Sequence, residues 1–323
     1  MRRISQIRIL VFYLFLLLLS GNIIAQEEDV LQKYEIKEQR LLGGHYFTPT
    51  NEIRMPFILT HVRTSLGVGG MSDLKYPSIE IGEEEYFYMQ GDVFVAILNF
   101  EYQHAVKHWL AVFARFGISG RLGSSLATLT KQGINYATTF DVGWLIKVYR
   151  NDKFVLSTSF EVTNGNYSII NLQQFINDVV DGVDDPSLTR SNNSVFGLAG
   201  VKAAYGFNEF IGLNAVLDLG YGETITRTLD NEFFTVSALN VDMNFYKLIN
   251  TPLSLSLGYL HSTYPKSNNS DVFSTNVLIA QINYIGRTDF VLSLDMLYSR
   301  ELSDSINPVV CVTAAMFSMR YLF

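Results

Sequence analysis

The sequence has little of what builds a disulfide-linked domain or a helical membrane protein. Its single cysteine, Cys311, excludes an internal disulfide. Charged residues make up only 17% of the 323 positions and hydrophobic residues 48%, yet after Ala25 no apolar run reaches the roughly 18 residues that a membrane-spanning helix needs. The apolar residues are therefore spread along the chain rather than gathered in helical spans. With only 7 prolines, the chain also keeps the long uninterrupted stretches that strands require.

Motifs of common cofactor sites are missing as well. The sequence has no glycine-rich phosphate loop leading into a helix, no cysteine and histidine cluster with zinc spacing, and no nucleophile elbow. We therefore predict no cofactor, no metal and, unless His261 provides one, no catalytic site.

The first 25 residues have the pattern of a cleaved secretory signal peptide. Arg2, Arg3 and Arg8 precede an apolar core at 9–19, and Ala25 offers a small residue at the cleavage site. Cleavage would remove three positive charges and no acids, so the formal net charge would change from −7 to −10. A chain this acidic is not expected to bind nucleic acid.

The remaining chain divides by composition. Residues 26–54 begin with polar residues and contain a Gly-Gly pair and a proline. We predict that they form a periplasmic lead-in segment, and that residues 55–323 form a single folded domain.

Apolar and polar residues alternate throughout that domain, and such alternation is typical of strands. We predict about twelve strands, near 57–68, 91–104, 108–122, 135–149, 153–163, 194–206, 209–222, 233–247, 252–264, 272–286, 289–301 and 308–323. Strands in soluble sheets usually have about five or six residues, whereas tilted strands that cross a bilayer need about nine to eleven. The lengths favour an antiparallel transmembrane β-barrel.

The connections between these strands alternate between tight turns and longer polar loops. The tight turns lie near 106–107, 151–152, 207–208, 250–252 and 287–288. Short turns at one end and long loops at the other are typical of a bacterial barrel with periplasmic turns and extracellular loops.

The charges within the strands can all be placed on one face. That face would carry Arg63, Glu101, Arg115, Arg121, Asp141, Lys147, Glu161, Lys202, Asp218, Asp242, Asp295 and Arg320. A basic side chain that faced lipid at mid-depth would cost about 2–4 kcal/mol. We therefore predict that the charged face lines the lumen and that the larger, more aromatic face contacts outer-membrane lipid, rather than the reverse arrangement of a water-soluble barrel.

The last strand places Phe317, Met319, Tyr321 and Phe323 on one face. This pattern resembles the C-terminal assembly signal of bacterial outer-membrane β-barrel proteins, with Phe317, Tyr321 and Phe323 as its aromatic residues. The resemblance covers the terminal strand in motif and residues 57–323 in pattern. It implies an outer-membrane location and the barrel assembly machinery as a partner, but no particular activity.

The third long loop contains residues at helical spacing: Ile169, Leu172, Ile176, Val179 and Val180. We predict an amphipathic helix of about four turns between 166 and 185, stopped by the sequence Asp184-Asp185-Pro186. Three positions are open to it: inside the barrel mouth as a gate, on the outer rim, or against the membrane. Its acidic residues disfavour an anionic lipid surface, which favours the mouth.

His261 and Thr263 fall on the outward face near the outer end of the strand at 252–264. The pair faintly resembles the His-x-Ser-Asn motif of outer-membrane lipid hydrolases, in which histidine is the base and serine the nucleophile. Here Thr263 replaces the serine, and no asparagine follows directly.

Three functions follow from these features. A barrel of about twelve strands has room for a narrow lumen only, so the leading hypothesis is a narrow channel or transporter for small solutes, with the loop helix as its gate. The second hypothesis is a non-conducting barrel that acts as an anchor or as a subunit of a secretion or surface complex. The third is a lipid hydrolase at His261 and Thr263.

Overall fold

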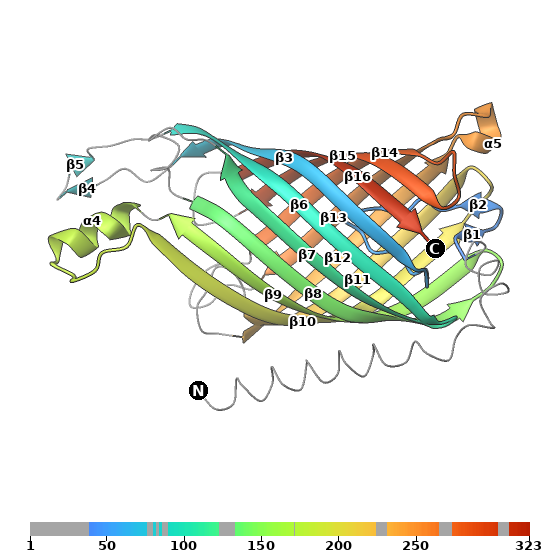
Figure 1. The fold of residues 1–323 in the computed structure, drawn as a ribbon, viewed down its shortest axis with the longest axis horizontal. Coiled ribbons are helices and arrows are strands. Elements are labelled where there is room, and N and C mark those ends of the chain that lie inside the picture. The colour runs from blue at the N-terminus through green and yellow to red at the C-terminus, as the bar shows by residue number, and fades with distance from the viewer. Residues whose placement is uncertain are drawn as a thin grey trace. The chain divides into compact units, whose positions relative to one another are not determined.

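The chain folds into a closed antiparallel β-barrel. The computed structural model describes residues 39–75, 80–81, 84–85, 90–122, 133–170, 172–223, 231–264, 273–302 and 310–323. Within these residues, twelve strands close into a barrel in which each strand pairs with the barrel strands before and after it, and the last strand pairs with the first (Figure 1). The predicted transmembrane-type barrel of about twelve strands is confirmed.

The barrel strands are β3 (His61–Lys75), β6 (Gln90–Lys107), β7 (Leu110–Leu122), β8 (Gly133–Arg150), β9 (Phe154–Ile170), β10 (Thr189–Gly206), β11 (Ile211–Glu223), β12 (Asn231–Asn244), β13 (Leu253–Tyr264), β14 (Phe273–Tyr284), β15 (Phe290–Leu302) and β16 (Val310–Leu322). Two small hairpins accompany them, formed by β1 (Leu41–Leu42) with β2 (His45–Tyr46) and by β4 (Glu80–Ile81) with β5 (Glu84–Glu85). The predicted signal peptide lies outside the described residues.

The alternation along each strand sorts side chains between the two faces of the wall. On β11, Leu217 is 57% exposed on the outside, whereas Asn214 is 0% exposed on the inside. A water-soluble barrel would show the opposite arrangement, because its apolar residues would fill the interior. The wall is therefore apolar on the outside and polar on the inside, as lipid contact requires.

The first barrel strand begins at His61, whereas the alternation indicated a strand from 57 and a folded domain from 55. Residues 57–60 do not join the sheet, because the side-chain amide of Gln103 donates hydrogen bonds to the carbonyls of Phe57 and Leu59 at 3.1 and 3.0 Å. These carbonyls are thereby satisfied without a strand partner. The apolar run at 57–59 is buried inside the barrel.

Short connections gather at one end of the barrel, which we call the short-turn end. The connection between β12 and β13 contains a short helix, α5 (Tyr246–Ile249), so β12 ends at Asn244 rather than near 247. Asn250 closes this helix in the left-handed region with a φ of 52°. The opposite end, which we call the long-loop end, carries the longer connections, most of which lie outside the described residues.

The connection between β9 and β10 contains the helix α4 (Leu172–Val180), beyond the long-loop end of the wall (Figure 1). It is shorter than expected, because Ile169 lies in β9 opposite Arg190. The helix stops at Gly182, which has a left-handed φ of 71°, and Val183 N donates to the Asp178 carbonyl at 2.9 Å. The terminator is thus this glycine and not the later Asp184-Asp185-Pro186. Among the described residues, no helix is long and apolar enough to span a bilayer.

Candidate functional site

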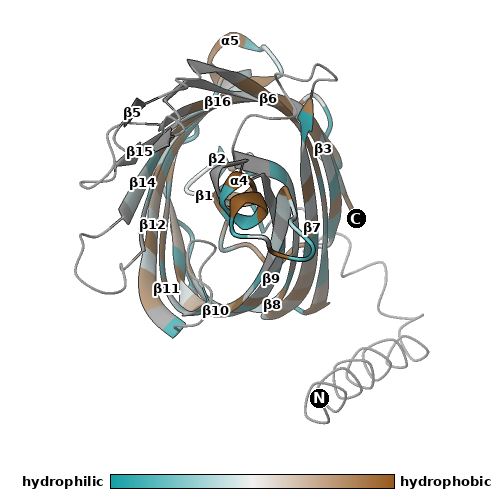
Figure 2. Ribbon diagram, turned by 90° about the vertical axis from the view of Figure 1, so that its left-hand side faces the viewer, coloured by the Kyte–Doolittle hydropathy of each residue, from teal (hydrophilic) through white to brown (hydrophobic). Residues whose placement is uncertain are grey.

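Residues 39–60, which we call the luminal segment, lie inside the barrel. In the view along the barrel, β1 and β2 are encircled by the barrel strands (Figure 2). Most of the segment is buried, and it forms hydrogen bonds to inward-facing side chains on both sides of the wall, from β3 and β6 to β12–β16. The sequence analysis instead predicts these residues in the periplasmic lead-in and at the start of the barrel. The remainder of that lead-in, residues 26–38, lies outside the described residues.

Asn51 is the centre of one network. Arg63 Nη1 donates to its carbonyl oxygen at 2.5 Å and to its side-chain oxygen at 3.1 Å, and Arg320 Nη2 donates to the same side-chain oxygen at 3.3 Å. The Nδ2 of Asn51 donates to Asp295 and, at 2.8 Å, to Ser318 Oγ. One neutral amide therefore links three strands, β3, β15 and β16, and satisfies both cationic and anionic groups.

Arg54 is the charged anchor of the segment. Its guanidinium lies 3.6 Å from Glu101 Oε1 and 3.9 Å from Glu161 Oε2, and 3.5 Å from the centre of the Phe113 ring. Burial lowers the pKa of Arg54, whereas Glu101 and Glu161 raise it. The side chain stays charged, because a guanidinium does not lose its proton in proteins. Arg54 thus joins the segment to β6, β7 and β9.

A third network holds the part of the segment nearer the short-turn end. Asp242 Oδ2 accepts a hydrogen bond from Thr48 N at 2.7 Å and lies 3.1 Å from His45 Nε2. Ser256 Oγ donates to the other oxygen of Asp242 at 2.8 Å, and the hydroxyls of Thr48 and Ser254 lie 2.7 Å apart. The carboxylate of Asp242 is therefore fully engaged although it is buried.

The hairpin of β1 and β2 depends on Gly43 and Gly44. Both have left-handed φ values, 57° and 84°, which suit a tight hairpin turn. Gly43 N donates to the Asp152 carbonyl at 2.6 Å. A Cβ at Gly43 would lie 2.5 Å from the carbonyl oxygen of Gly206, so only glycine fits against the wall here.

Several buried polar atoms between the segment and the wall have no hydrogen-bond partner within the described residues. They include both side-chain amide atoms of Asn214 and of Asn240, which are cross-strand neighbours on β11 and β12. A cavity of about 30 Å³ beside Arg54 has room for a water molecule. Each unsatisfied buried group costs about 1–3 kcal/mol. Unpartnered atoms also occur within the charged networks, at Arg54 Nη2 and Arg63 Nε, so the polar interface holds the segment less tightly than a fully satisfied one would.

The structure buries most of the strand charges that the alternation assigned to the lumen. The buried ones are Arg63, Glu101, Asp141, Glu161, Lys202, Asp242, Asp295 and Arg320. The half-buried ones are Arg115, Arg121, Lys147 and Asp218. Neighbouring strands carry a continuous row of these groups in cross-strand register: Arg320, Arg63, Glu101, Arg115 and Asp141.

Ion pairs join several of these charges to one another. Arg115 lies 2.5 Å from Asp141 and 2.9 Å from Glu161, and Arg63 lies 2.9 Å from Glu101. Within the described residues, no group of three histidine, cysteine or acidic side chains is arranged to hold a metal ion. The charges instead pair with one another and with the luminal segment.

Helix α4 leaves part of its apolar face uncovered by the described residues. Val180 is 78% exposed and Val179 is exposed as well, whereas Ile176 is half-buried. Of the residues expected to form a gating helix, Leu172, Ile176, Val179 and Val180 lie in α4, and Ile169 lies in β9. Whether the helix acts as a gate stays a prediction.

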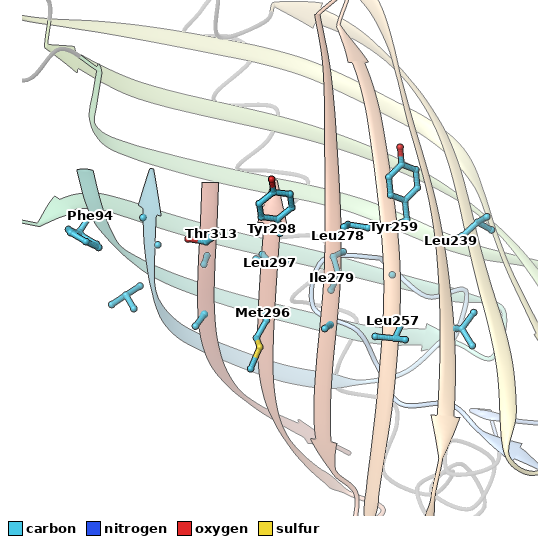
Figure 3. Close-up of a pocket in the computed structure, with 18 residues that line it drawn as sticks. Phe94, Leu239, Leu257, Tyr259, Leu278, Ile279, Met296, Leu297, Tyr298 and Thr313 are labelled. Carbon is cyan, nitrogen blue, oxygen red and sulfur yellow. The ribbon is translucent and has the colours of Figure 1, made fainter. Parts of the chain in front are cut away.

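The outer wall is apolar over a wide area. A shallow groove crosses β12–β16, β3 and β6, and large side chains such as Leu239, Leu257 and Met296 line it (Figure 3). Small residues, among them Ala280 and Ala315, separate them. The residues of the predicted assembly signal are exposed on the same outer face: Phe317 and Tyr321 on β16, and Phe323 directly after it.

The structure also adds a residue to the His261 and Thr263 pair. Asn276, on the neighbouring strand β14, places its Oδ1 at 2.9 Å from His261 Nδ1, and the Tyr259 hydroxyl donates to the same oxygen at 2.5 Å. The sequence analysis missed Asn276, which antiparallel pairing of these two strands would have found. Thr263 bonds instead to Thr235, with 2.5 Å between the hydroxyls, and no hydrogen bond joins it to His261 in the described part of the chain.

Comparisons with known proteins agree on the architecture. No family model matches the sequence, and no curated protein matches it. Among solved structures, an outer-membrane channel from Pseudomonas putida F1 is similar, with a TM-score of 0.51 and 12% identity over 86% of this chain and 100% of that chain. The translocator domain of the autotransporter NalP from Neisseria meningitidis has a TM-score of 0.50 and 11% identity over 83% of this chain and 90% of that one. The fold is that of a bacterial outer-membrane β-barrel.

Within that fold, the luminal segment is the feature that distinguishes the interior of this barrel from an open pore. It brings Asn51 and Arg54 to the lumen charges that the sequence had already indicated. The candidate functional site is therefore the interface between residues 39–60 and the inner wall.

Proposed function

We propose that this chain is an outer-membrane channel for small solutes whose passage the luminal segment closes at the short-turn end. The observation that supports this most strongly is the kind of contact that holds the segment. Asn51, Arg54 and Thr48 attach it through hydrogen bonds and ion pairs to side chains of the wall. Water can replace these polar contacts when the segment moves, whereas the apolar packing of Ile53 and Ile58 against the wall favours the closed state.

The wall does not depend on the segment for its closure. The ladder between β16 and β3 runs without interruption from Cys311 opposite Ser72 to Leu322 opposite His61, and every other barrel strand is paired on both sides. A barrel that is complete without its luminal segment can tolerate displacement of that segment. In this proposal the short turns face the periplasm, the long loops face outward, and α4 is a second gating element at the outer mouth.

Recordings in planar bilayers test the channel directly. The full chain should show rare, brief openings, because the closed arrangement is held by several networks. A chain that never conducts, and that stays silent after removal of residues 39–60, would refute the channel and favour a non-conducting anchor or subunit. Stoichiometric co-purification of a partner would then support that alternative.

A lipid hydrolase remains a second candidate, because the hydrogen bond between His261 and Asn276 orients the imidazole as in hydrolases that use a His–Asn pair. We expect His261→Ala and Thr263→Val to lower phospholipid hydrolysis in mixed micelles by about a hundredfold or more. Ser262→Ala, which changes an inward residue of the same strand, should leave the rate unchanged. Equal rates in all four proteins, or no hydrolysis by the unaltered chain, would exclude this activity.

A further inference from the structure

The inner wall changes character between the luminal segment and the long-loop end. On β12–β15, the inward positions nearer the short-turn end include Asp242, Gln281 and Asp295, which are polar. Farther toward the long-loop end, the same strands carry a group of apolar inward residues: Val236, Ala238, Leu260, Val277, Ile279 and Leu297. Beyond this group lie the polar Ser262 and Thr275. Four neighbouring strands thus present a continuous apolar band to the interior.

The luminal segment supplies the floor of this band. Ile53 packs with Val216, Ala238 and Ile279 in one buried cluster, against which Leu260, Val277 and Leu297 are partly buried. A Cβ at Gly258 would lie 3.0 Å from Ile53 Cδ1, so the isoleucine rests directly on the wall. Ile53 of the luminal segment therefore contacts the apolar band directly.

The part of the band nearer the long-loop end is not covered by the described residues. Leu260, Val277 and Leu297 point inward and yet remain partly exposed. Apolar surface that faces water is unfavourable by roughly 25 cal/mol per Å². An occupant that covers it would therefore be favoured if it can enter the barrel.

The enclosure limits what that occupant can be. Twelve hydrogen-bonded strands surround the band, and Ile53 lies below it, which excludes a folded partner or a second copy of the chain. The band itself carries no charged side chain. Asp218, which lies opposite Val236 on the neighbouring strand β11, is paired with Lys202. The facing wall of β8 and β9 presents the inward residues Thr139 and Thr163. A small neutral apolar molecule suits a site with one apolar wall beside an ion pair that is already formed.

We propose that the lumen above the luminal segment binds small, neutral, apolar solutes against Leu260, Val277 and Leu297, with Ile53 as the floor of the site. This inference rests on the proposed channel and specifies the class of solute that reaches its gate. A solute at this position contacts the luminal segment itself, so occupancy of the site and opening of the channel are physically linked.

Crystals of the full chain soaked with iodobenzene test the site, because iodine is located by its anomalous scattering. We expect an iodine position in the lumen within about 4 Å of Leu260, Val277 or Leu297. Iodine found only on the outer groove of Figure 3, or a lumen filled by α4 or another segment of the chain, would overturn the inference.

Calorimetric titration in detergent gives the affinity, after correction for partition of iodobenzene into protein-free micelles. Leu260→Asn should weaken binding about tenfold or more, since it replaces an apolar contact with a polar group. The matched control is Leu257→Asn, on the outer face of the same strand, which should leave the affinity unchanged. Equal affinities for both variants would refute the site. A chain that conducts without residues 39–60 but binds no iodobenzene would refute only the solute class and not the channel.

Discussion

Removal of residues 39–60 is expected to turn a mostly closed barrel into a steadily conducting pore. The segment is the only described part of the chain that lies across the lumen at the short-turn end, and the wall remains hydrogen-bonded without it. We expect the mean single-channel current to rise about tenfold or more, which corresponds to a change of only about 1.4 kcal/mol in the balance between closed and open states. Recording of single channels in planar bilayers measures it.

A matched deletion separates the luminal segment from the loop helix. Removal of residues 172–180, which form α4, should leave the closed state dominant, because this helix makes none of the contacts to Asn51, Arg54 or Thr48. A steady current after this second deletion, with none after the first, would show that α4 and not the luminal segment closes the barrel.

Arg54→Ala is expected to lower the free energy of unfolding by about 1.5–3 kcal/mol, because it removes one of the two cations beside each of two buried carboxylates. Glu101 would keep Arg63 at 2.9 Å, and Glu161 would keep Arg115 at 2.9 Å. Both would nevertheless lose the charge that now joins the segment to the wall. Denaturant unfolding in detergent measures the change as a shift of the midpoint at constant slope.

Two further variants control for this experiment. Glu161→Gln combined with Arg54→Ala should recover part of the lost stability, because the buried group that has lost one of its two cations is then neutral. Arg287→Ala breaks the exposed pair of Arg287 with Asp289 at 2.8 Å and should produce no measurable shift, since solvent screens such pairs. If Arg54→Ala unfolds at the same denaturant concentration as the unaltered chain, Arg54 is not an anchor.

Alternation in the sequence was sufficient to predict the barrel, because the face that a strand residue occupies is a local property of period two. It placed Asp242 and Asp295 on the polar face, and the structure buries both inside the wall. Its errors lie at strand ends, where β9 and β10 extend beyond the predicted limits to Ile170 and Thr189. A further error concerns the helix between these strands, which is shorter than predicted. Turn chemistry accounts for it, because Gly182 rather than a later proline ends α4.

The luminal segment could not be predicted in the same way, because its position depends on contacts far apart in the sequence. Asn51 bonds to Asp295 and Ser318, which lie 244 and 267 residues away. The apolar run at 57–59 has the composition of a strand and was interpreted as one. Two local signals were present, the Gly43-Gly44 turn and the lack of strict alternation before His61, but neither says where the segment docks.

The proposed closure of the channel requires that residues 39–60 lie inside the barrel, and a cross-link measures that position most directly. The hydroxyls of Thr48 and Ser254 lie 2.7 Å apart, so cysteines at these two positions, with Cys311→Ser, should form a disulfide on mild oxidation. The bond would appear as a change in gel mobility that a reductant reverses. Cysteines at Thr48 and Ser262, a buried inward position farther along the same strand, should stay reduced. No cross-link in the first pair, or equal cross-linking in both, would contradict the account.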